Sequence, residues 1–165
     1  MTSRITPGLK SNIGVLALGN LLRTDEGVGI HVLEALREHL PLEVETLDGA
    51  TSGLELLDFI ERHQSLIVLD AVDAGKAPGQ VIIWDNDQVP QFTTKKLSLH
   101  QTGFAEVLFW GQFTGIIPEK IMVVGIQPQS LDWGIALTET IQKSLPAAVE
   151  AVLDCIENWK QLDCV

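Results

Sequence analysis

The segment Asn12-Ile-Gly-Val-Leu-Ala-Leu18, followed by a helical pattern from Gly27 to Leu40, decides the fold of this chain. The first segment is a short, continuous apolar run, which is typical of a strand covered on both faces. Between Gly27 and Leu40 the apolar residues recur on one helical stripe, and Pro41 ends the pattern. A buried strand followed by an amphipathic helix begins a strand–helix–strand unit, in which the two strands are parallel.

The alternation of strands and helices continues through the rest of the chain. Further strands are expected at Leu42–Leu47, Leu66–Leu69, Gln80–Trp84 and Lys120–Ile126. Further helices are expected after a cap at Thr51 or Ser52, from about Ser98 to Phe113, and from about Thr138 or Pro146 to Trp159. Pro146 either begins the last helix or kinks a longer one.

This alternation predicts one α/β domain over residues 1–165, with a core from about 13 to 160. We expect three layers, α/β/α: a mostly parallel, twisted central sheet of about five strands, with helices on both of its faces.

Composition excludes several classes of function. The chain has 11 Lys and Arg against 22 Asp and Glu, a formal net charge of −11. This charge disfavours nucleic acid and anionic membranes as partners, because both attract clustered basic residues. No run of about 18 apolar residues predicts a membrane span, and the polar start lacks the apolar middle of a secretory signal. Cys155 and Cys164 lie nine residues apart, on opposite faces of a continuous helix, so we expect reduced cysteines in a cytoplasmic protein.

Acidic residues and one imidazole follow the ends of the predicted strands. Asp25 and Glu26 lie where the first helix begins, Asp48 ends the second strand, and Asp70 ends the third. The region after the fourth strand leads to His100. In such sheets, ligands bind outside the carboxyl ends of the strands, where the strand order reverses. Carboxylates with an imidazole suit nickel, zinc or iron, and three protein ligands would leave coordination positions open.

Each of these residues also has a structural interpretation. Asp25 or Glu26 could cap a helix and interact with its dipole. Asp48 could form an ordinary turn, and His100 could be a hydrogen-bonded surface or core histidine. Asp70 is harder to explain in this way, because it ends an apolar run where a solvated charge has no structural need.

The glycine-rich segment from Gly19 to Gly29 raises the alternative of a nucleotide site. It matches neither G-x-G-x-x-G nor a phosphate-binding loop with Lys and Ser or Thr. Asp25 and Glu26 would also repel phosphates at the start of the helix. The sequence has no G-x-S-x-G elbow and no H-E-x-x-H helix, which argues against a serine hydrolase or an ordinary zinc protease.

Five motifs in order resemble the hydrogenase maturation endopeptidase family, which processes the large subunits of [NiFe]-hydrogenases. They run from about Ile13 to near Ile156 and cover nearly the whole chain. The motifs are Gly19-Asn-Leu-Leu-Arg-Thr-Asp25-Glu26-Gly27-Val-Gly29, Asp48-Gly-Ala-Thr51, Asp70-Ala71, His100-Gln101 and Val124-Gly-Ile-Gln-Pro-Gln-Ser-Leu131.

The resemblance implies a reaction, a partner and a set of site residues. The reaction is hydrolysis of one peptide bond near the C-terminus of the large-subunit precursor, after nickel has been installed. The family's metal-binding trio falls on Glu26, Asp70 and His100, which would engage nickel carried by the substrate and not a permanent cofactor. Asp48 is a candidate for a carboxylate that helps to activate water. A nickel-binding assembly factor without hydrolytic activity would use the same trio and remains the alternative.

Overall fold

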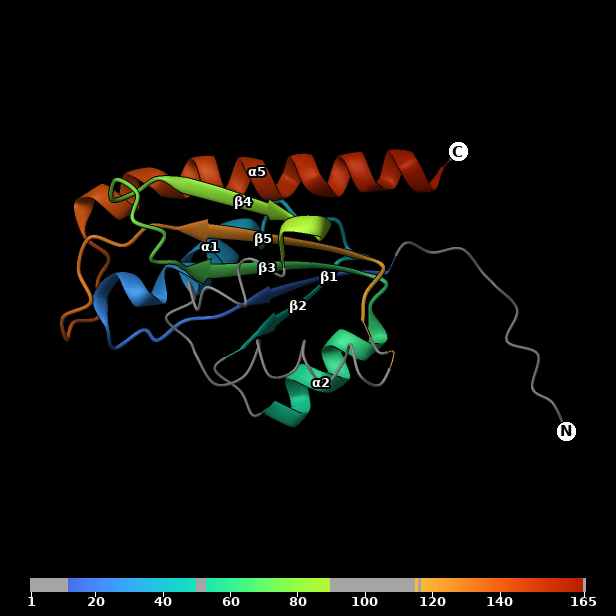
Figure 1. The fold of residues 1–165 in the computed structure, drawn as a ribbon, viewed down its shortest axis with the longest axis horizontal. Coiled ribbons are helices and arrows are strands. Elements are labelled where there is room, and N and C mark those ends of the chain that lie inside the picture. The colour runs from blue at the N-terminus through green and yellow to red at the C-terminus, as the bar shows by residue number, and fades with distance from the viewer. Residues whose placement is uncertain (1–11, 50–52, 90–114, 116, 165) are drawn as a thin grey trace, which may run out of the picture.

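A five-stranded sheet forms the centre of the computed structural model, which describes residues 12–49, 53–89, 115 and 117–164 (Figure 1). Its strands are β1 (Ile13–Ala17), β2 (Glu45–Asp48), β3 (Ser65–Ala71), β4 (Val81–Asp85) and β5 (Lys120–Ile126). Their order is β2-β1-β3-β5-β4; neighbouring strands are parallel except for β4, which runs antiparallel to β5 at one edge. The predicted mostly parallel sheet of about five strands is confirmed.

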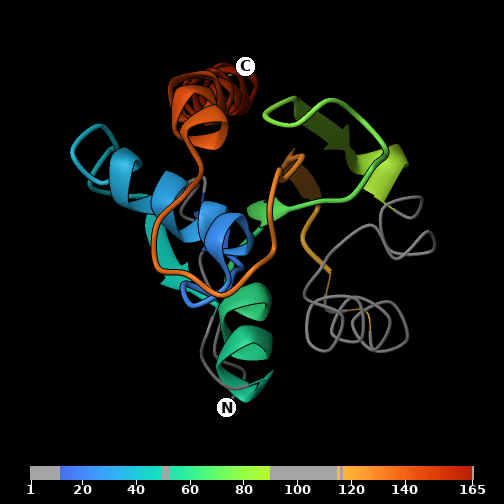
Figure 2. The same ribbon diagram turned by 90° about the vertical axis from the view of Figure 1, so that its left-hand side faces the viewer.

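Helices cover both faces of the sheet, as the alternation predicts. In the described part of the chain the helical elements are the 3-10 helix η1 (Thr24–Gly27), α1 (Val28–Leu36), α2 (Gly53–Arg62), the 3-10 helix η2 (Asn86–Gln88) and α5 (Glu139–Asp163). The helices α1 and α5 lie on one face and α2 lies on the other, which gives the expected three layers (Figure 2). The helix expected from Ser98 to Phe113 lies outside the described residues.

Two helices differ in their bounds from the predicted ones. The pattern that begins at Gly27 belongs to the end of η1 and to α1, which ends at Leu36 and is followed by turns up to Leu40. Pro146 lies inside α5, so it does not begin that helix. It lacks the N–H that would bond the carbonyl four residues earlier, and the rest of the 25-residue helix continues past this gap.

Two apolar clusters hold the layers together. Val15, Leu33 and Val152 belong to the cluster between the sheet and the helices α1 and α5. Leu16 and Phe59 belong to the cluster between the sheet and α2. Every residue of β1 and β3 is buried, because both faces of these central strands are covered.

The two cysteines are free, as expected from their spacing. Cys155 is buried on the inner face of α5, and its burial, with a smaller contribution from Asp85, raises the pKa of the thiol to about 12. Cys164 is exposed at the end of the same helix. Cys155 therefore stays a protonated, unreactive thiol at neutral pH.

Within the described residues, no helix combines the length and the apolar composition needed to cross a bilayer.

Candidate functional site

The carboxyl ends of β1, β2 and β3 meet at one edge of the sheet, which faces the viewer in Figure 2. The register pairs Ala17 of β1 with Asp48 on one side and with Leu69 on the other. The chain leaves β1 toward β2 and then returns to β3 on the opposite side of β1, so the strand order reverses between β1 and β3. This is the position where ligands bind in open α/β sheets.

Asp70 lies at this edge and is completely buried, with an exposed fraction of 0%. Alternation along β3 puts its side chain on the α2 face, the face that Val68 and Val72 also share. Its register partner on β5 is Gly125, and a Cβ atom there would lie 2.0 Å from Val72 and 2.7 Å from the ring of Trp84. Val72 and Trp84 therefore cover the sheet face next to Asp70. Burying a carboxylate in such surroundings costs free energy, which marks Asp70 as a functional candidate.

Glu26 reaches the same edge from η1, which packs against β3. Its side chain is 14% exposed, and its Oε2 lies 3.7 Å from Nε of Arg23. The Arg23 side chain is also held by the carbonyl of Leu131, which accepts a hydrogen bond from Nε at 2.9 Å. Glu26 is thus a partly buried carboxylate at the same edge of the sheet as the completely buried Asp70.

Gly29 allows α1 to begin in direct contact with this edge. A Cβ atom at Gly29 would lie 2.3 Å from the carbonyl oxygen of Leu18 and 2.5 Å from that of Leu69. Both oxygens belong to the backbone where β1 and β3 end, so neither can rotate away. The absence of a side chain at Gly29 therefore sets how closely η1 and Glu26 approach the sheet.

The Gly29→Ala variant is expected to lower the free energy of unfolding by about 1–3 kcal/mol, because α1 has to recede from the two carbonyl oxygens. Alanine is the better helix former by about 1 kcal/mol, so a loss of stability would show that the contact outweighs propensity. Urea denaturation at neutral pH measures the difference. Glu34→Ala on the exposed side of α1 is the matched control, and equal stability of Gly29→Ala and the wild type would contradict the close-packing argument.

Asp48 reaches the same edge but occupies a different face. Leu47 packs into the cluster on the α2 face, so alternation turns Asp48 toward the face covered by α1 and α5, opposite to Asp70. The strands β2 and β3 are separated by β1, which places the ends of these strands about 10 Å apart. The structure thus brings Asp48 to the edge without placing it beside Asp70, and its role with water stays a prediction.

The predicted third ligand, His100, lies outside the described residues. Within the described ranges, no group of three or more His, Cys, Asp or Glu side chains is close enough to hold a metal ion. Glu26 and Asp70 would therefore need a ligand from elsewhere in the chain or from a substrate. The predicted trio is not tested by the structure.

Asp25 has a structural role that differs from capping its own helix. Its carboxylate is completely buried and accepts hydrogen bonds from the backbone N–H groups of Gln129 (3.0 Å), Ser130 (2.9 Å) and Thr138 (2.8 Å). The hydroxyl of Thr138 donates to the same carboxylate. Because Thr138 is the residue before α5, Asp25 ties the start of the last helix to η1.

Residues 21–25 and 129–135 form two adjoining segments that backbone hydrogen bonds join; we call them the double loop (Figure 2). The carbonyl of Leu22 accepts a hydrogen bond from the N–H of Gly134 (3.0 Å), and the carbonyl of Gly134 accepts one from Thr24 (2.9 Å). Ser130 accepts a further bond from the N–H of Asp25 (3.2 Å). Sequence reasoning missed this arrangement, for which the run of turn-forming residues after β5 was the available signal.

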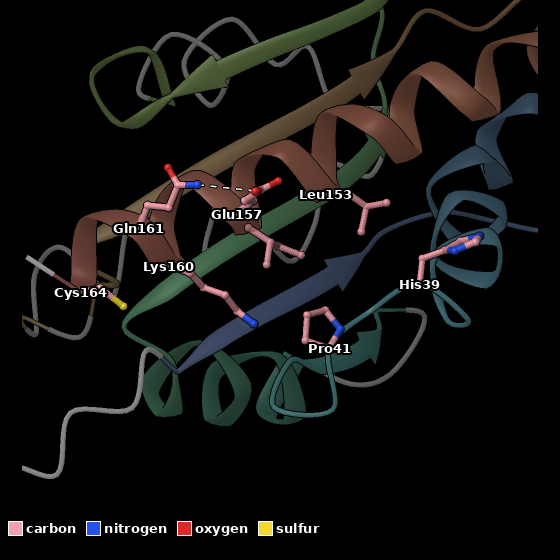
Figure 3. A pocket seen from close by; sticks show the side chains of 8 residues that line it. His39, Pro41, Leu153, Glu157, Lys160, Gln161 and Cys164 are labelled. Carbon is pink, nitrogen blue, oxygen red and sulfur yellow. Dashed lines mark hydrogen bonds between the residues drawn. The ribbon is translucent and has the colours of Figure 1, made fainter.

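A separate groove of about 610 Å³ lies between the C-terminal half of α5 and the turn before β2 (Figure 3). His39, Pro41, Lys160 and Cys164 are among the residues that line it. The amine of Lys160 forms an ion pair with Glu43 beside the groove. The described site residues Glu26, Asp48 and Asp70 do not line it, so the groove is separate from the edge that holds them.

The geometry defines an α/β protein with an acidic site at the switch point of a mostly parallel sheet. Residues 30–155 match the family model described as hydrogenase maturation protease. The hydrogenase expression/formation protein HupD of Rhizobium leguminosarum bv. viciae is 44% identical over 149 residues, which are 88% of this chain and 74% of the relative. The hydrogenase 2 maturation protease of Escherichia coli is 44% identical over 147 residues, which are 87% and 90% of the two chains.

The fold agrees with these sequence comparisons. The structure of the hydrogenase maturating endopeptidase HybD from E. coli superimposes with a TM-score of 0.82 and 41% identity, over 89% of this chain and 93% of that chain. The chain therefore belongs to the hydrogenase maturation protease family, whose named members are peptidases.

Proposed function

We propose that this chain is an endopeptidase that removes a C-terminal peptide from the nickel-loaded large-subunit precursor of a [NiFe]-hydrogenase. Membership of the family and the names of its relatives as maturation proteases support a peptidase with a hydrogenase subunit as substrate. The observation that carries the assignment of the site is the complete burial of Asp70 at the switch point, with Glu26 held at the same edge.

In this proposal Glu26, Asp70 and His100 engage the nickel that the precursor brings. Carboxylate and imidazole groups suit nickel, and three protein ligands leave positions for groups of the substrate itself. The metal is part of the substrate and leaves with the product. Engagement by the protease fixes the position of the scissile bond, so that only a loaded precursor is presented for cleavage.

Hydrolysis also requires a group that accepts a proton from the attacking water. The water oxygen adds to the carbonyl carbon of the scissile bond, and the proton passes through a carboxylate to the departing amine. Asp48 is our candidate for this carboxylate, since it ends a strand at the same edge of the sheet. Its position on the opposite face from Asp70 means that a substrate segment lying across the edge would pass between the two groups.

We expect the purified protein to shorten a nickel-loaded precursor and to leave a nickel-free precursor intact. Intact mass measurement of the large subunit before and after incubation detects the loss of the C-terminal peptide. Equal cleavage of both precursors would contradict the role of nickel. Binding of the loaded precursor without any change in its mass would contradict the peptidase and favour the assembly-factor alternative.

A further inference from the structure

Large apolar side chains are exposed on the double loop beside the candidate site. The exposed fractions are 42% for Leu21, 58% for Leu22, 76% for Trp133 and 79% for Ile135. These are four of the seven exposed large apolar side chains found in the described part of the chain, although the double loop is a small share of its length. We call these four residues the apolar rim.

The apolar rim is held in place by the hydrogen bonds of the double loop. An isolated β-bridge pairs Arg23 with Gly134, so Leu22 and Trp133 lie on the two adjoining segments of the double loop. The buried carboxylate of Asp25 accepts hydrogen bonds from residues at the start of the second segment and just beyond its end, which holds this segment in place. Little conformational freedom therefore remains to be lost when a partner covers this surface, which favours binding.

The apolar rim is continuous with the candidate site through one side chain. The guanidinium of Arg23 lies 5.2 Å from the centre of the Trp133 ring, and its Nε lies 3.7 Å from Glu26. A molecule that places a reacting group near Glu26 would therefore also lie close to Trp133.

The size of the apolar rim indicates the kind of occupant. Monomeric proteins rarely expose larger contiguous apolar patches than a few hundred Å² unless these are binding surfaces, and tryptophan is enriched among the residues that dominate binding energy. A stable dimer buries about 800 Å² on each partner, which four side chains do not provide. The area suits a partner that binds and leaves, as a protein substrate does.

We propose that the apolar rim docks the protein substrate, by packing against an apolar part of the precursor's surface next to the segment that is cleaved. The inference rests on the proposed function for the identity of the substrate. In the proposed function, binding of nickel distinguishes a loaded precursor from an unloaded one. Contact with the apolar rim adds affinity for the precursor and selects it over other proteins.

The test uses a double variant, Trp133→Ser with Ile135→Ser, in the full chain. Both side chains are exposed, so the melting temperature should stay close to that of the wild type. With the nickel-loaded precursor we expect KM to rise about tenfold or more, while the rate at saturating precursor changes less than about threefold. Biolayer interferometry with immobilised precursor measures binding separately from cleavage. Trp133→Leu, which keeps an apolar side chain, should recover part of the affinity.

Two exposed apolar residues far from the double loop provide matched controls. Leu42→Ser and Ile83→Ser remove comparable side chains elsewhere on the surface and should leave KM unchanged.

Unchanged KM and unchanged binding in the double variant, with an active wild type, would overturn the docking role of the apolar rim while leaving the proposed function in place. Loss of binding in the double variant without cleavage by the wild type would support the apolar rim and overturn the peptidase. A wild type that sediments as a dimer and a double variant that sediments as a monomer would assign the surface to a second copy of the chain and overturn the proposal.

Discussion

Asp70→Asn is expected to slow cleavage of the nickel-loaded precursor by roughly 100-fold or more, because in the proposed function it removes a carboxylate from the set that engages nickel. Asparagine has nearly the same shape as aspartate, so the packing around the completely buried Asp70 side chain is preserved. We expect a melting temperature within about 5 °C of the wild type, which separates a loss of function from a loss of fold. Single-turnover cleavage followed by intact mass measures the rate.

Glu26→Gln and His100→Gln should show losses of the same kind, since the proposal assigns all three residues to one metal-engaging set. Asp87→Asn, at an exposed acid in η2, is the matched control and should cleave at the wild-type rate. Wild-type cleavage by all three site variants would overturn the assignment of Glu26, Asp70 and His100. Loss in only one of them would identify that residue as the group that matters for the reaction.

Asp25→Ala is expected to reduce the free energy of unfolding by about 3–5 kcal/mol, a large share of the stability of a domain of this size. The substitution removes the acceptor of three backbone N–H groups and one hydroxyl, all in the segment between Gln129 and Thr138. Leaving buried donors without an acceptor costs more than the hydrogen bonds themselves contribute. Urea denaturation provides the measurement.

Asp132→Ala is the matched control for this variant, because Asp132 is an exposed acid in the same segment. We expect its effect to stay within about 0.5 kcal/mol. A loss of less than about 1 kcal/mol in Asp25→Ala would mean that water replaces the carboxylate as acceptor. In that case the double loop would be held by its backbone hydrogen bonds alone.

Most of the sheet could be predicted from the sequence because hydrophobic runs mark buried strands directly. The apolar runs around Val15, Ile67 and Val123 identify three of the five strands. The direction of β4 could not be predicted in this way, since an apolar run reads alike in a parallel and an antiparallel strand. The end of α1 at Leu36 was also missed, because the turns up to Leu40 continue the apolar spacing of the helix.

A site residue could be predicted where the residues next to it in the sequence mark it. It could not be predicted where its role depends on partners far along the chain. Asp70 is visible in the sequence because a charge directly follows four apolar residues. The role of Asp25 is not, since the groups that donate to it lie 104 to 113 residues further along the chain. The separation of Asp48 from Asp70 likewise needs the register of β1 with both of its neighbours.

The missing side chain at Gly125 has an electrostatic consequence for the neighbouring strand. Val72 and Trp84 close over the glycine, so apolar side chains instead of water cover the sheet beside the buried Asp70. The attraction between unit charges 4 Å apart is about 1 kcal/mol in bulk water and about 4 kcal/mol at an effective dielectric constant of 20. The direct attraction of a divalent ion to the carboxylate is twice that of a monovalent ion, before the cost of removing the ion's hydration is counted. In the proposed function, salt in the surrounding solution therefore has little power to screen the attraction between Asp70 and a metal ion carried by the substrate.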